Sequence, residues 1–150
     1  MKKFILGLFL ILGAISFAAP KFVDMAKVKN AGYIIKNERE DILTMAISDD
    51  DSAIIISFST ANMSSKEISD LLKSNALRNS ENFIAILDNN RAYVNEFEAQ
   101  GFYSYIIVPK KEKVKNQHTY ATYVSSKKLS KNDLSKITNA ILDEAESYIK

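Results

Sequence analysis

The fold is decided by residues 42–59, whose sequence is ILTMAISDDDSAIIISFS. Two runs rich in β-branched and other apolar residues flank three aspartates. Such runs suit a pleated sheet surface, whereas Asp side chains bond to the local backbone and interrupt strands. The stretch therefore predicts two strands, 42–48 and 53–59, joined by a tight turn at 49–52.

Two long helices are predicted beyond this hairpin. Ser64 and Glu67 have the spacing of a capping box, in which each side chain accepts a hydrogen bond from a backbone amide of the other residue. A helix is therefore expected over 64–79. The same spacing of serine and acid begins a second helix over 130–149, which carries an apolar stripe. Short apolar runs predict further strands at 33–35, 83–87, 92–97, 102–108 and 119–125. This alternation predicts an α+β domain with a mostly antiparallel sheet packed by the two helices.

Residues 22–31 distinguish two versions of this architecture. Their Met, Ala and Lys residues favour a short N-terminal helix, and Gly32 stands where a C-cap glycine belongs. A second reading comes from an internal similarity, because residues 63–71 align with 129–137 without a gap. That similarity suggests a duplicated, strand-rich unit ending in a helix, in which 22–31 corresponds to 82–91 and is a strand.

The N-terminus has the three parts of a secretory signal. Lys2 and Lys3 precede an apolar run over 4–15, and small residues follow at 16 and 18. The run is shorter than the roughly 20 apolar residues that span a bilayer. We therefore predict a cleaved signal peptide over 1–18 and a mature form that does not span the membrane. The expected compartment is periplasmic or extracellular.

The remainder, residues 20–150, is predicted to form one domain. The full chain has 20 Lys and Arg against 18 Asp and Glu, and two lysines leave with the signal peptide. The mature form is therefore formally neutral, which argues against nucleic acid as a partner. The sequence holds no cysteine, so the core has to stabilise the domain without disulfides.

The residues that carry common catalytic chemistry are scarce. There is no thiol, and His118 is the single histidine. Gly32 and Gly101 are the only glycines after residue 13, so a phosphate-binding loop is not expected. The acidic turn at 49–51 lacks the glycine and distal glutamate of a calcium loop. We therefore predict no catalytic residue, no metal site and no cofactor, and hence a protein that is not an enzyme.

Two groups of side chains are candidates for binding. Tyrosine buries a large area and keeps a polar tip, which suits a partner surface. The tyrosines that we expect on neighbouring strands are Tyr103, Tyr105, Tyr120 and Tyr123. A lysine-rich region is a candidate contact for anions, with solvated protection of a strand edge as the alternative. Its members are Lys110, Lys111, Lys113, Lys115, Lys127 and Lys128.

The order of these segments resembles the YbjN-type, type III secretion chaperone-like family, in an exported version. The resemblance spans 22–150 in outline, and its closest local likeness is the end of the first long helix with the Asn-containing stretch that follows, Leu72 to Asn82. It implies an α/β sandwich that recognises protein partners without catalysis, with a homodimer as one form.

The leading functional expectation is an exported, non-enzymatic domain that binds a protein or peptide through its sheet. The alternative is a binder of a small envelope ligand or an anionic surface, using the lysines and a cavity between sheet and helices. A hydrolase is the third class, and no nucleophile–base pair supports it.

Overall fold

The computed structural model describes residues 18–150, so the predicted signal peptide lies outside the described residues except for Ala18. Within these residues, three helices and seven strands follow one another. They are α2 (Met25–Asn30), β1 (Ile34–Arg39), β2 (Ile42–Ser48), β3 (Ser52–Thr60), α3 (Ser65–Arg78), β4 (Asn82–Leu87), β5 (Ala92–Ala99), β6 (Phe102–Pro109), β7 (Gln117–Ser125) and α4 (Lys131–Ser147).

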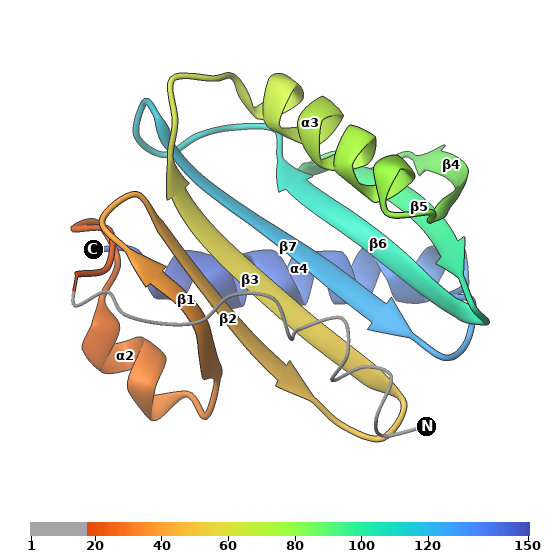
Figure 1. The fold of residues 1–150 in the computed structure, drawn as a ribbon, viewed down its shortest axis with the longest axis horizontal. Helices are drawn as coiled ribbons and strands as arrows, with labels where there is room; N and C mark the ends of the chain where they lie inside the picture. The colour runs from red at the N-terminus through yellow and green to blue at the C-terminus, as the bar shows by residue number, and fades with distance from the viewer. Residues whose placement is uncertain (1–17) are drawn as a thin grey trace.

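All strands belong to one antiparallel sheet in the order β1-β2-β3-β7-β6-β5-β4. Each half is a meander, and the halves join where β3 pairs with β7 along its whole length, with Ile56 opposite Ala121. The β3–β7 pair is the middle of the sheet in Figure 1, and β1 and β4 are its two edges. The α+β class with a mostly antiparallel sheet is confirmed.

The two long helices cover opposite faces of the sheet. In Figure 1, α3 lies in front of β5 and β6, whereas α4 runs behind the strands. The alternation of side chains along β6 shows the same division, because Ile107 packs in the cluster with α4 and Val108 packs in the cluster with α3.

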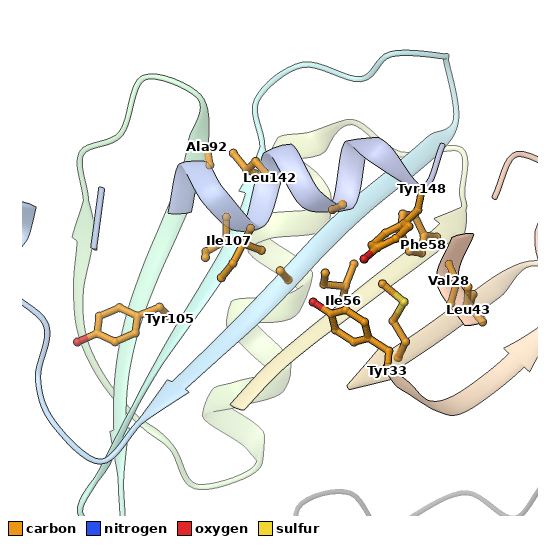
Figure 2. Close-up of a cluster of buried hydrophobic side chains, with 14 of the residues drawn as sticks. Val28, Tyr33, Leu43, Ile56, Phe58, Ala92, Tyr105, Ile107, Leu142 and Tyr148 are labelled. Atoms are coloured by element: carbon orange, nitrogen blue, oxygen red, sulfur yellow. The ribbon is translucent and has the colours of Figure 1, made fainter. Parts of the chain in front are cut away.

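The larger core lies between the sheet and α4. Leu134, Ile141 and Leu142 of α4 pack onto a layer formed by residues from strands of both halves of the sheet. Figure 2 shows Leu142 beside Ala92 and above Ile107 at one end of this layer, and Tyr148 near Phe58 and Tyr33 at the other. The hydroxyls of Tyr33 and Tyr148 both donate to Glu144 Oε1 at 2.9 Å. Burial and this carboxylate raise the pKa of Tyr148 to about 12.

Both predicted long helices are confirmed with their caps. Ser64 precedes α3, its hydroxyl accepts from the Glu67 amide, and Glu67 accepts from the Ser64 amide. Ser130 precedes α4, and its hydroxyl accepts from the Asp133 amide at 3.1 Å. None of the helices within residues 18–150 is both long and apolar enough to cross a membrane.

The segment 22–31 supports the first of the two architectures. Residues 25–30 form α2, whose N-cap is Asp24, and Gly32 follows with a φ of +80°. The duplicated-unit alternative required a strand here, as in β4, so that prediction is wrong. An isolated antiparallel β-bridge between Val23 and Ile149 connects the start of the domain to its end.

Candidate functional site

The two edges of the sheet differ in chemistry. The sequence of β1 is IIKNER, which places three charged side chains on that edge, whereas β4 is NFIAIL and has none. Native proteins commonly use charged residues on edge strands to prevent pairing with another chain. Within the described residues no strand pairs with the outer side of β4, and its Ile86 side chain is 67% exposed. The β4 edge is therefore apolar and carries no charged residue, and its register with β5 shifts between Phe83 and Ala85.

An open-sided groove, here called the β4 groove, borders this edge. It lies on the α4 side of the sheet, between β4, β5 and the first half of α4, and its volume is about 600 Å³. Leu87, Val94, Leu129 and Leu134 give it apolar walls. A more polar hollow of about 390 Å³ adjoins it and shares Asp88, Asn89 and Ser135 with it.

Glu96 is the charged group of the groove with the least exposure. It lies on β5, its residue is 3% exposed, and its nearest cation is Lys128 Nζ at 3.7 Å. The Lys128 side chain is itself 55% exposed, so this ion pair reaches from the buried carboxylate to the surface. A buried carboxylate needs a partner, because its transfer from water is costly. The long aliphatic stem of Lys128 brings its ammonium group to the carboxylate from the rim of the groove.

The Tyr105 hydroxyl lies beside Glu96, on the neighbouring strand β6. It accepts a hydrogen bond from the Leu129 amide at 2.8 Å, which ties β6 to the loop before α4. Burial raises the pKa of Tyr105, and the neighbouring Glu96 carboxylate adds to the effect, while the Leu129 amide acts in the opposite direction. Figure 2 shows this ring at the margin of the labelled cluster, with its hydroxyl directed away from the other labelled side chains.

Thr138 is the second unusual polar residue in the wall. It is fully buried on α4, and among the described residues its Oγ1 is the one buried side-chain polar atom without a hydrogen-bond partner. In helices a threonine hydroxyl can bond to a carbonyl of the preceding turn, which would satisfy it. This hydroxyl makes no such bond, so the groove contains both a buried carboxylate and an unsatisfied hydroxyl.

The register of β4 decides what lies between Glu96 and the open edge. Ala85 is directly opposite Glu96, and Glu96 is directly opposite Tyr105 on the next strand. The three residues therefore form a row across one face of the sheet. Because Ala85 ends in a single methyl group, it leaves the space between the β4 edge and the Glu96 carboxylate largely unfilled.

No protein-family model, curated protein or solved structure matches the chain. The edge strand and the groove are therefore the basis for a functional assignment.

The tyrosines predicted to form one partner surface are divided by the sheet. Tyr103, Tyr105 and Tyr123 belong to the α4 side, and Tyr105 is 0% exposed, with its ring centroid 6.3 Å from that of Tyr123. Tyr120 packs with the α3 cluster on the other face. The prediction of a single tyrosine surface is therefore corrected: one member is core, and the four do not face the same way.

The predicted lysine loop is likewise two separate groups. Lys110, Lys111, Lys113 and Lys115 follow β6, whereas Lys127 and Lys128 follow β7. These connections lie at opposite ends of an antiparallel pair, and a nine-residue strand is roughly 30 Å long. Lys113 Nζ is 3.3 Å from Glu146 Oε2, and Lys110 Nζ donates to the Asn89 carbonyl. One combined anion-binding cluster is thus not formed.

The other polar candidates have local structural partners. His118 is buried, and its Nε2 is 3.0 Å from the Ala61 carbonyl, to which it must donate because a carbonyl only accepts. Asp49 accepts hydrogen bonds from the amides of Asp51 and Ser52, which lowers its pKa and closes the predicted turn. His118 therefore stabilises the start of β7, and Asp49 stabilises the turn between β2 and β3.

The sequence reasoning did not identify Glu96, Thr138 or the β4 edge. The run NFIAIL is visible in the sequence as an uncharged strand. Such a run is typical of a strand that is covered on both sides. What was missing is the position of that strand in the sheet, since only an edge location leaves such a run unpaired.

Proposed function

We propose that this chain is an exported, non-enzymatic domain that binds an extended peptide segment of another protein along β4. In this mode the peptide adds a strand to an open sheet edge, so main-chain hydrogen bonds supply affinity and pockets for alternate side chains supply specificity. The observation that carries the proposal is the uncharged, exposed β4 edge beside the β4 groove.

The contrast between the two edges supports this choice of site. Ile34 on β1 and Ile86 on β4 are similarly exposed, at 61% and 67%. The β1 strand nevertheless carries Lys36, Glu38 and Arg39, which discourage an incoming strand. A partner-binding role is also what the resemblance to the chaperone-like family implies.

A small-ligand binder is the second candidate, because the volume of the β4 groove lies in the range of ordinary small-molecule pockets, about 300–1,000 Å³. The two candidate functions differ in whether the backbone of β4 takes part in binding. A ligand held in the groove alone needs no backbone pairing with β4, so blocking the edge leaves its binding intact. Recruitment to an anionic surface has less support, because the lysines are split between two ends of the sheet.

The proposal is tested with a random library of 12-residue peptides displayed on phage and selected on the purified protein. Affinities of enriched peptides are then measured by fluorescence anisotropy for the wild type and three edge variants. Ile86→Lys and Ile86→Glu place opposite charges on β4, and both are expected to weaken binding at least tenfold. Ile34→Lys is the matched control on β1 and is expected to leave the affinity unchanged.

The pair of β4 variants separates strand addition from simple electrostatics. If charge alone decided binding, Ile86→Lys and Ile86→Glu would shift the affinity in opposite directions. Failure to enrich any peptide, or equal binding by Ile86→Lys, Ile86→Glu and the wild type, would overturn the proposed function.

A further inference from the structure

We infer that the β4 groove recognises a lysine or arginine side chain of the bound peptide, and that this residue stands opposite Ala85 with its cationic head at Glu96. The inference rests on the proposed function and specifies its partner as a basic, extended segment. Three observations carry it: the buried carboxylate, the small residue that clears a path to it, and the unsatisfied hydroxyl in the same wall.

The first step is electrostatic complementarity. Glu96 is a carboxylate at 3% exposure, and among residues 18–150 its ion-pair partner is Lys128. The ammonium of Lys128 is held from the rim at 3.7 Å and its side chain is mostly in solvent, so it can return to water when another cation takes its place at Glu96. An incoming cation that is buried in the groove replaces a pair that is exposed on its lysine side with a pair that is shielded on both sides, in which charge attraction is stronger.

The second step is reach. Adjacent strands lie about 4.8 Å apart, so a residue of the added strand opposite Ala85 is about 10 Å from Glu96, two strand spacings across. That residue points to the α4 face, as Ala85 and Glu96 do. Lysine has a flexible four-carbon stem and arginine a comparably long one, and Glu96 extends toward them from the other side. A short side chain at this position would end above the Ala85 methyl group.

The third step is the lining of the path. Leu129 and Leu134 offer apolar surface along which a lysine or arginine stem packs while its head stays polar. Thr138 Oγ1 is buried in the same wall without a partner, and a hydroxyl can accept from an ammonium or guanidinium group. A cation in the groove therefore meets a buried carboxylate and a hydroxyl that has no hydrogen-bond partner among the described residues.

A second copy of this chain is a less suitable occupant of the edge. Strand β4 has six residues and carries no charged side chain, so a β4–β4 pair brings no cation to Glu96. A basic segment of another polypeptide can pair with the backbone of β4 and also bring a cation to Glu96.

The test is a double-mutant cycle between protein and peptide. The peptides enriched from the 12-residue library are expected to share a Lys or Arg at one fixed position. Replacing that residue by norleucine, which keeps the four-carbon stem, should raise Kd roughly ten- to hundredfold on the wild type. On Glu96→Gln the same replacement should change Kd less than threefold, because the partner charge is already gone.

Glu98→Gln is the matched control, since Glu98 is on the same strand and accepts from the Gly101 amide outside the groove. It should preserve the full effect of the norleucine replacement. The wild-type arm needs no protein variant and stays informative if Glu96→Gln folds poorly. Peptides that bind at β4 without a basic preference, or an equal norleucine effect on the wild type and Glu96→Gln, would overturn this inference and leave the proposed function standing. A library that enriches nothing would overturn both.

Discussion

Thr138 and Glu96 are polar residues in places where the core alone would favour apolar ones. Thr138 is surrounded by protein on α4, and an unsatisfied buried hydroxyl costs about 1–3 kcal/mol of folding free energy. Glu96 faces apolar walls and relies on a lysine at the rim. The Thr138 hydroxyl therefore does not stabilise the free protein, and the Glu96 carboxylate needs a counter-charge that reaches it from the surface.

Replacing the Thr138 hydroxyl by a methyl group should therefore stabilise the free protein. We expect Thr138→Val to raise the free energy of unfolding by about 1 kcal/mol, measured by urea denaturation. Thr44→Val is the contrasting control, because Thr44 Oγ1 is bonded to Ser57 Oγ at 3.0 Å and its loss should destabilise by about 1 kcal/mol. If Thr138→Val destabilised the protein as much as Thr44→Val does, the hydroxyl would have a structural partner after all.

At the scale of single elements, the sequence predicted what depends on local chemistry. The pair Ser64 and Glu67 predicted the start of α3, and the three aspartates predicted the turn between β2 and β3. Both features depend on residues that are neighbours along the chain. The alternation of side chains along a strand also determines how the tyrosines divide between the two faces of the sheet. Tyr120 and Tyr123 are three residues apart on one strand and so must face opposite ways.

The order of the strands depended on contacts that are distant in sequence. The central β3–β7 pair joins residues 52–60 to 117–125, and no local pattern specifies that partnership. The position of β4 at an edge follows from this pairing, as does the placement of the groove beneath α4. The candidate site was therefore beyond the reach of local sequence patterns, although its apolar strand was visible.

Helix α2 illustrates how packing sustains an element that propensity only suggests. A six-residue helix is unstable by itself in water, and α2 is held by its Asp24 cap and by Val28, which is fully buried. We expect Val28→Ala to lower the free energy of unfolding by about 1.5–3 kcal/mol in urea denaturation. Lys29→Ala, at an exposed position of the same helix, should change it by less than about 0.5 kcal/mol. Equal effects of the two substitutions would mean that α2 is not docked on the core.

For the whole molecule, the arrangement of layers limits where a partner can pair with the sheet. Helices α3 and α4 lie on opposite faces of the sheet, as Figure 1 shows, so a partner strand is left with the two edges. Charged side chains occupy β1, and the other edge leads directly into the β4 groove. The proposed function therefore depends on the pairing of β4 with an extended segment of another polypeptide.

Residue-resolved amide hydrogen exchange measured by NMR, with and without a saturating enriched peptide, tests this claim most directly. Strand addition predicts that alternate amides of Asn82–Leu87, unpaired in the free protein, become protected, because outward-facing N–H groups then donate to the peptide. The amides of Ile34–Arg39 on the opposite edge should exchange as before. Protection confined to β1 or to the loop over 110–116, with β4 exchanging at its free rate, would contradict the account.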